Sequence, residues 1–244
     1  MIHSFLLIGQ SNMAGRGFMS EACEIDVRHI KTLRNGRWQQ MFRPINPDRS
    51  TAGVNLAESF AEAYAAKYGV DVGLICCADG GTSLEQWQEG SILYENAVNQ
   101  ARLAMRTSNI VGILWHQGEA DREATLASTY VERFEKMITA MKRDIGIGDI
   151  PVILGELGEF LGASTVVNYR TVNEQLHKIA ERNPYTGVAS SKGLTSNPDN
   201  LHFNAKSLYE FGLRYFAEFE KLCDTDRVLE EKDADLNRTA MELL

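Results

Sequence analysis

Short apolar runs alternate with longer amphipathic segments along the chain, and this alternation limits the folds open to it. An apolar run of roughly four to eight residues suits a buried strand, whereas apolar residues at helical spacing indicate a helix with one buried face. The pattern predicts five strands, over residues 3–9, 70–78, 109–118, 150–157 and 186–191. It also predicts five helices, over residues 55–69, 92–107, about 122–144, about 166–182 and about 204–222.

Strands that alternate with helices are typical of a parallel sheet whose two faces are both covered. We therefore expect a flavodoxin-like, three-layer α/β/α sandwich with a mostly parallel, five-stranded sheet. No repeat and no linker interrupts residues 1–223, which favours a single domain, and the charged residues 224–244 predict a tail or a loosely packed helix. The segment from Glu21 to Ser50 fits neither pattern, and we expect it to wrap over the functional site.

Charge and hydropathy narrow the classes of partner. The formal net charge is −8 and no basic cluster is present, so nucleic acid is not expected as a partner. No apolar run approaches the roughly 18 residues of a membrane-spanning helix. The run from Phe5 to Ile8 is also shorter than the roughly 7–15 apolar residues of a signal peptide core. We therefore expect a cytoplasmic protein without a membrane partner, and nothing in the sequence indicates an oligomeric state.

Polar or small residues lie at, or just after, the carboxyl end of each predicted strand. In open parallel sheets, ligands bind outside the carboxyl ends of the strands. Residues far apart in the sequence should therefore meet at this edge of the sheet. The residues in these positions are Ser11, Gly80–Gly81, His116–Gln117, Glu156 and Ser190–Ser191.

Ser11 lies in the stretch "GQSNMAGRG", directly after the first predicted strand. The serine could cap a helix, or it could be a nucleophile held beside free backbone N–H groups that stabilise negative charge. Gly9 can supply the tight turn, but the second glycine of the G-x-S-x-G nucleophile motif is missing. Taken alone, this stretch favours the helix cap.

The stretch "DNLHF" places Asp199 three residues before His202. A carboxylate at this spacing can accept a hydrogen bond from one imidazole nitrogen, which leaves the other free to take a proton from a hydroxyl. Such pairs also occur on ordinary surfaces. Together with Ser11, the pair would complete a triad in the order Ser, Asp, His.

Two further stretches carry candidate groups. The glycine pair in "ADGGTSLEQW" either allows the backbone to approach a ligand or forms a tight turn. In "WHQGEAD", the amide of Gln117 could donate to an oxyanion, although an ordinary loop is an equal alternative. His116 and Glu119 suggest a metal, but no second histidine stands at ligand spacing and the four cysteines show none either. We expect neither a metal nor a cofactor.

These four stretches together resemble the SGNH/GDSL hydrolase superfamily, and in particular its branch of sialate O-acetylesterases and carbohydrate esterase family 6 acetylxylan esterases. They occur in the family's order and span residues 9–203. The resemblance implies the SGNH fold and hydrolysis of acetyl esters on sugars. The partner would be a small-molecule or oligosaccharide acetyl ester, such as an acetylated sialic acid or xylo-oligosaccharide.

The resemblance also implies roles for individual residues. Ser11 would be the nucleophile, His202 the general base and Asp199 its orienting carboxylate. The oxyanion donors would be the backbone N–H groups of Ser11 and Gly81 and the side chain of Gln117. Supporting or substrate-binding residues would be Gln10, Gly80, Trp87, His116, Glu119 and Arg16.

Some of these supporting roles are more specific. Gly80 would be the N–H donor in place of Gly81 if the roles within this glycine pair are shifted by one residue. Trp87 is the best candidate for an apolar face under a sugar, Trp38 is another, and Trp115 more plausibly packs in the core. Arg16 would meet either an anionic substrate or a nearby acid.

Two rival functions stay open. The first is a carbohydrate-binding protein without catalysis, although it would have no need of serine, aspartate and histidine together. The second is a lipase or thioesterase of the same superfamily, from which "WHQGEAD" points away.

Overall fold

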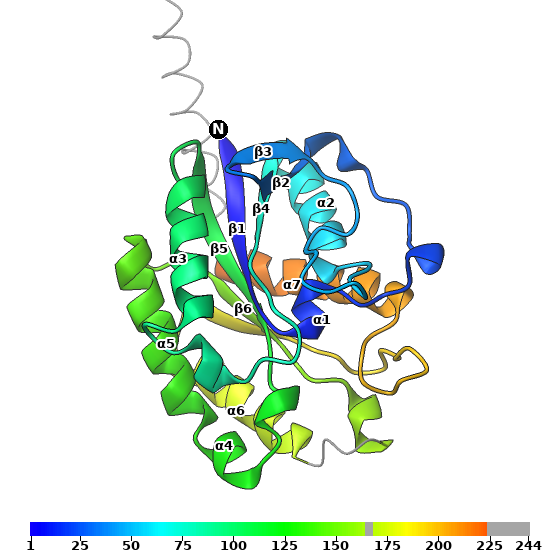
Figure 1. The fold of residues 1–244 in the computed structure, drawn as a ribbon, viewed down its shortest axis with the longest axis vertical. Helices are drawn as coiled ribbons and strands as arrows, with labels where there is room; N and C mark the ends of the chain where they lie inside the picture. Colours follow the sequence, from blue (N-terminus) through cyan, green and yellow to red (C-terminus); the bar gives the residue numbers. More distant parts are fainter. Residues whose placement is uncertain (164–167, 224–244) are drawn as a thin grey trace, which may run out of the picture.

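The computed structural model describes residues 1–163 and 168–223, so the predicted tail or helix over 224–244 lies outside it. Seven strands form one sheet in the order β3-β2-β4-β1-β5-β6-β7. Only β2 and β3 pair antiparallel (Figure 1). The strands are β1 (Ile2–Gly9), β2 (Ile30–Arg34), β3 (Arg37–Gln40), β4 (Val72–Cys76), β5 (Ser108–His116), β6 (Val152–Gly155) and β7 (Thr186–Ala189).

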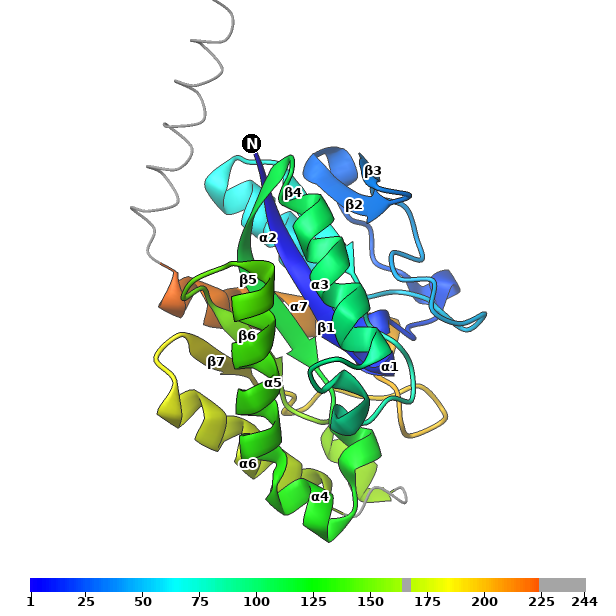
Figure 2. The ribbon, with the colours of Figure 1, turned by 60° about the vertical axis from the view of Figure 1, so that its left-hand side comes forward.

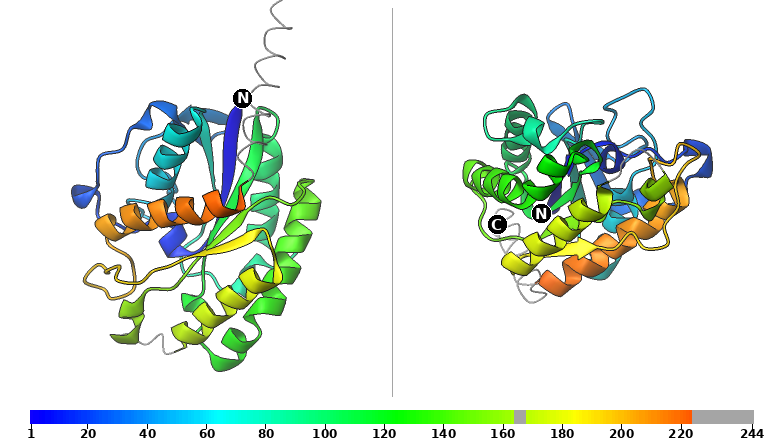
Figure 3. Two further views of the ribbon diagram at one scale, coloured as in Figure 1. Left: turned by 180° about the vertical axis from the view of Figure 1, so that it is seen from behind. Right: turned by 90° about the horizontal axis from the view of Figure 1, so that it is seen from below.

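Helices cover both faces of this sheet, which gives the expected three layers. Helices α3, α5 and α6 pack on one face, and α2 and α7 pack on the other (Figures 2 and 3). The helices are α1 (Ser11–Ala14), α2 (Leu56–Tyr68), α3 (Ile92–Ala104), α4 (Ala124–Ser128), α5 (Tyr130–Ile145), α6 (Tyr169–Arg182) and α7 (Ala205–Leu222). No helix in the described part of the chain combines the length and the apolar character needed to cross a bilayer.

The central strand β1 shows why the apolar runs are continuous. Leu6 and Ile8 belong to the core under α3, α5 and α6, whereas Phe5 and Leu7 belong to the core under α2 and α7. Side chains alternate between the two faces of a strand, so a strand covered on both faces must be apolar at every position.

All five predicted strands are present, but the sheet is wider than predicted. The segment expected to be irregular contains the hairpin of β2 and β3, which extends the sheet beyond β4. Asn35 and Gly36 form its two-residue turn with positive φ angles of 50° and 75°, as the tight turn of a hairpin requires. The single helix predicted over about 122–144 is also two helices, α4 and α5.

The strand order explains where a site can form. After β1 the chain forms β2, β3 and β4 on one side of β1, and it then forms β5 on the other side. Such a change of direction opens a crevice at the carboxyl ends of the strands. Ser11 follows β1 directly and therefore lies at this crevice.

Candidate active site

Ser11 is positioned by a close approach of two strands. Strand β1 ends at Gly9, whose φ is 129° and whose added Cβ would lie 2.2 Å from the carbonyl oxygen of His116. Gln10 is the residue that precedes helix α1, and Ser11 is its first helical residue. The Ser11 hydroxyl lies 3.0 Å from Nε2 of His202. The helix-cap interpretation of Ser11 is therefore wrong.

The predicted aspartate and histidine continue this contact. His202 Nδ1 lies 2.7 Å from one carboxylate oxygen of Asp199. The other oxygen accepts the backbone N–H groups of Leu201 at 2.9 Å and of His202 at 3.0 Å. A carboxylate acceptor favours the proton on Nδ1, which leaves Nε2 free to accept from the serine hydroxyl. The structure thus joins Asp199, His202 and Ser11 in one hydrogen-bonded chain.

The carboxylate of Asp199 stays charged at neutral pH. Partial burial opposes its ionisation, but hydrogen bonds from the backbone and ring of His202 and from the backbone of Leu201 prevail. They hold the pKa of Asp199 below its ordinary value.

The glycine pair after β4 lies near Ser11, because Asp79 donates its backbone N–H to the carbonyl of Gly9 at 3.0 Å. Gly80 donates its N–H to Asp48 at 2.8 Å and is not free to bind a ligand. Gly81 is exposed with a φ of 78°, and its N–H makes no hydrogen bond to the described residues. The N–H of Ser11 makes none either. Gly81 and Ser11 therefore stay available as donors.

Arg16 pairs with an acid. Its two terminal nitrogens lie 3.0 and 2.6 Å from the two carboxylate oxygens of Asp48, and both side chains are buried. Asp48 also holds Gly80, so this ion pair supports the glycine loop. Asp48 comes from the segment expected to wrap over the site. That segment does reach the site, although nothing in the sequence singled out Asp48.

The structure contradicts the direct donor role predicted for Gln117. Its side chain is fully buried, and its amide nitrogen donates to Asp121 at 2.6 Å and to the carbonyl of Thr82 at 3.1 Å. Its amide oxygen accepts the hydroxyl of Tyr130 at 2.9 Å. A fully buried amide with these partners cannot contact a bound oxyanion, so Gln117 lies beneath the site.

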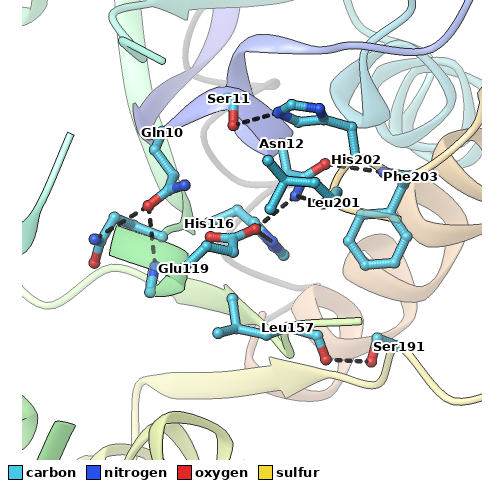
Figure 4. Close-up of polar contacts among 12 residues, drawn as sticks. Gln10, Ser11, Asn12, His116, Glu119, Leu157, Ser191, Leu201, His202 and Phe203 are labelled. Atoms are coloured by element: carbon cyan, nitrogen blue, oxygen red, sulfur yellow. Dashed lines mark hydrogen bonds and ion pairs between the residues drawn. The ribbon is translucent and has the colours of Figure 1, made fainter. Parts of the chain in front are cut away.

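Gln10, which was predicted to support the site, contacts the turn that follows β5. Its side-chain oxygen lies within 3.4 Å of three nitrogens, which belong to the Gln117 amide and to the backbone of Gly118 and Ala120 (Figure 4). The residue before Ser11 is thus connected to the turn that follows β5.

The tryptophans do not form the predicted sugar-binding face. Trp87 is fully buried, and its indole N–H donates to the hydroxyl of Thr82 at 3.0 Å, so the prediction for it is wrong. Trp115 is buried in the core, as predicted. Trp38 packs over Gly73 near the start of β4, which is the opposite edge of the sheet from Ser11.

A groove beside the Ser11–His202 contact is lined partly by residues that the sequence did not single out. It has a volume of about 400 Å³, and Asp199, His202 and Arg16 line one part of it. Phe18 and Met19 line another part, and each is 46% exposed. Both follow the serine stretch directly, but only the structure shows that they are exposed there.

His116 and Glu119 lie beneath Ser11, with Nε2 of His116 3.6 Å from the Glu119 carboxylate. Both side chains are buried. Within residues 1–163 and 168–223, no three His, Cys, Asp or Glu side chains lie close enough together to hold a metal ion.

Asp121 connects two of the sequence stretches, and sequence reasoning gave it no such role. Its carboxylate is fully buried and accepts the backbone N–H of Leu84 at 2.8 Å as well as the Gln117 amide. Arg133 of α5 lies 2.9 Å from its second oxygen. Through its contact with Leu84, Asp121 joins the loop after β4 to the turn after β5.

Replacement of Arg133 by leucine is expected to lower the free energy of unfolding by about 3–5 kcal/mol, because Asp121 would lose the cation that compensates its buried charge. Denaturant unfolding measures this loss. Arg143→Leu is the matched control: Arg143 is on the same helix, but its ion pairs are exposed and their loss should change little. Equal stability of the two variants would contradict the role of Asp121.

Glu119 should contribute to the pH dependence of stability. Burial opposes its ionisation, but the neighbouring His116 ring, 3.6 Å away, and a hydrogen bond from Asn12 hold the pKa of Glu119 below the ordinary value of 4.5. The unfolded chain therefore binds its proton first, and stability falls as the pH drops below about 4.5. In Glu119→Gln, the free energy of unfolding should depend less on pH in this range, and chemical denaturation between pH 3 and 6 tests this. An unchanged slope would contradict the lowered pKa.

The seven-stranded three-layer fold, with the serine after the first strand and Asp-x-x-His before the last helix, defines an SGNH-hydrolase-like protein. The family model described as carbohydrate esterase, sialic acid-specific acetylesterase matches residues 1–221, and the chain belongs to this family. A probable carbohydrate esterase of Arabidopsis thaliana is 27% identical, and the match covers 86% of each chain.

Solved structures agree with the fold. The structure of the Arabidopsis protein superposes with a TM-score of 0.81 at 25% identity, covering 91% of this chain and 99% of that one. The structure of NanS gives 0.66 at 16% identity, covering 90% and 97%. A carbohydrate acetylesterase of Xanthomonas citri gives 0.66 at 19% identity, covering 88% of this chain and 55% of that one. The last two similarities concern the fold alone.

Proposed function

We propose that this protein is a serine esterase that removes O-acetyl groups from carbohydrates through an acetyl-enzyme on Ser11. The observation that carries the proposal is the hydrogen-bonded chain from Asp199 through His202 to Ser11, with contacts of 2.7 and 3.0 Å. It lies beside the groove at the carboxyl edge of the sheet. Membership of a carbohydrate esterase family supports the substrate class.

The reaction follows from this arrangement. The Ser11 hydroxyl attacks the acetyl carbonyl while Nε2 of His202 takes its proton, and Asp199 stabilises the resulting imidazolium. The backbone N–H groups of Ser11 and Gly81 stabilise the oxyanion. His202 then protonates the sugar oxygen, the C–O bond to the acetyl carbon breaks, and the sugar alcohol leaves. Water activated by His202 hydrolyses the acetyl-enzyme to acetate and regenerates the serine.

The charges around the groove favour a neutral sugar over an anionic one. Arg16 is the only lysine or arginine that lines the groove in the described part of the chain, and Asp48 neutralises it. Arg49, which reaches Gly80 nearby, pairs with Asp79 at 2.7 Å. A sialic acid carboxylate would find no unpaired cation there, whereas the hydroxyl groups of a neutral sugar need only polar partners.

Phe18 is proposed as the apolar face that supports the sugar ring, in the role first predicted for Trp87. Phe18→Ala should raise KM for an acetylated sugar about 2–12-fold, because about 0.5–1.5 kcal/mol of ring contact is lost. Its kcat on p-nitrophenyl acetate should not change. Steady-state kinetics measures both, and Phe42→Ala, which removes a similarly exposed ring outside the groove, is the control. An unchanged KM for the sugar would reject this role.

The proposed function is tested by measuring acetate release from acetylated xylo-oligosaccharides and O-acetylated sialic acid. Wild type is compared with Ser11→Ala, and p-nitrophenyl octanoate is included as a lipase substrate. We expect release from the neutral sugar, and none from Ser11→Ala. Preference for octanoate would indicate a lipase, and sugar binding without turnover by wild type would indicate a carbohydrate-binding protein.

A further inference from the structure

The side chain of Asn12, the residue after the nucleophile, contacts the main chain on both sides of His202. Its oxygen accepts the backbone N–H of Phe203 at 3.1 Å, and its nitrogen lies 3.3 Å from the carbonyl oxygen of Leu201 (Figure 4). Leu201 and Phe203 are the two neighbours of His202. One buried amide therefore brackets the residue that contacts the Ser11 hydroxyl.

Glu119 determines how this amide is turned. Its carboxylate oxygen accepts from the Asn12 nitrogen at 2.6 Å, and both side chains are buried. A carboxylate only accepts hydrogen bonds, so it fixes the nitrogen of the amide toward itself and the oxygen toward Phe203. Glu119 comes from the short helical turn Glu119–Asp121 that follows β5.

The other contacts near His202 constrain the loop less closely, and the Asn197 side chain, five residues away, donates to the carbonyl of Arg16 at 2.8 Å. The hydrogen bonds of Asp199 to Leu201 and His202 lie within the loop itself, so they move with it. The Phe203 ring packs against His116 and Phe211 with centroid distances of 5.7 and 5.0 Å. Such apolar contacts tolerate small displacements, whereas hydrogen bonds are directional, and a misplacement of about 1 Å can lower a rate about 10²-fold.

We propose that Asn12 and Glu119 are positioning residues: the Glu119 carboxylate orients the Asn12 amide, and the amide holds His202 at hydrogen-bonding distance from Ser11. The inference rests on the proposed esterase function. It also separates Glu119 from the aspartate of the triad, because Glu119 contacts Asn12 and His116 and not the His202 ring.

The proposal is tested by exchanging the amide of Asn12 and the carboxylate of Glu119 between the two positions. Asn12→Asp places two carboxylates 2.6 Å apart and should lower kcat on p-nitrophenyl acetate about 10²-fold with little change in KM. In the double variant Asn12→Asp/Glu119→Gln, the glutamine amide can donate to the new aspartate, which still accepts from Phe203. The kcat of this double variant should be at least tenfold higher than that of Asn12→Asp.

A merely structural role predicts a different result, in which Tm falls but kcat measured well below Tm does not. Asn173→Asp is the matched control, because Asn173 brackets the backbone N–H and carbonyl of Leu157 at 2.7 and 3.0 Å in the same manner. It should lower Tm and leave kcat unchanged. Should Asn12→Asp not fold, Asn12→Ala removes the bracket without adding a charge and should lower kcat at least tenfold.

The rate at which diisopropyl fluorophosphate modifies Ser11 separates this proposal from the proposed function. The reaction needs the serine and its base but no sugar. A wild type that hydrolyses no ester would overturn the proposed function. Even then, the positioning role would be supported if Ser11 were modified more slowly in Asn12→Asp and the modification rate recovered in the double variant. Folded Asn12 variants with wild-type kcat and modification rates, or a double variant no faster than Asn12→Asp, would overturn it. A wild-type Ser11 that reacts no faster than in His202→Ala would overturn both.

Discussion

Ser11→Ala is expected to lower kcat on p-nitrophenyl acetate by about 10⁶-fold, because no other group can form the acetyl-enzyme. Gly81 and the groove remain in this variant, so substrate binding should survive. The measurement is acetate release at saturating substrate, together with mass spectrometry of the protein quenched during turnover. Wild type should carry one added acetyl group, and the variant none. A variant that retains more than about 1% of the wild-type kcat would contradict the nucleophilic role.

Ser190→Ala is the matched control for this experiment. Ser190 also lies at the carboxyl edge of the sheet, and its hydroxyl donates to Glu156 at 2.8 Å. His177 contacts the same carboxylate at 2.7 Å. Here the carboxylate stands between serine and histidine, so the histidine cannot take the serine proton. Ser190→Ala should therefore keep the wild-type kcat.

Asp199→Asn is expected to lower kcat by about 10⁴-fold, a smaller loss than that of Ser11→Ala. The amide oxygen of asparagine can still accept from the backbone of Leu201 and His202, so the loop should keep its shape. The amide nitrogen can donate to the ring of His202, which favours the tautomer that cannot accept the serine proton. Steady-state kinetics at neutral pH measures the loss.

The pH dependence gives a second test of Asp199. Since the pKa of its carboxyl lies below the ordinary value of 3.8, Asp199 is charged at pH 5 and above. Protonation of Asp199 should therefore not limit the wild-type kcat between pH 5 and 8. An Asp199→Asn variant within tenfold of the wild-type kcat across this range would mean that the carboxylate only shapes the loop.

The sequence predicted the central part of the fold because its strands are buried on both faces and are apolar throughout. The edge hairpin was missed for the opposite reason. In β2 only Ile30 and Thr32 are buried, and β3 contains arginine, tryptophan and two glutamines without a buried position. An edge hairpin with so few buried positions leaves little periodic signal.

The candidate site was predicted where its contacts are local or follow from the strand ends. Asp199 and His202 are three residues apart, and Ser11 stands directly after β1. The predictions for Gln117 and Trp87 failed because their orientation depends on distant partners. The Gln117 amide donates a hydrogen bond to Asp121 beneath the site, and the indole of the buried Trp87 donates one to Thr82. A single sequence indicates that a polar residue ends a strand, but not which way its side chain turns.

The contact between Ser11 and His202 joins residues that are 191 positions apart. During synthesis Ser11 leaves the ribosome long before His202 is made. A nascent chain that stops before His202 cannot form this contact, so we expect such a chain to show none of the proposed activity. Onset of that activity during synthesis would then report that His202 has reached Ser11.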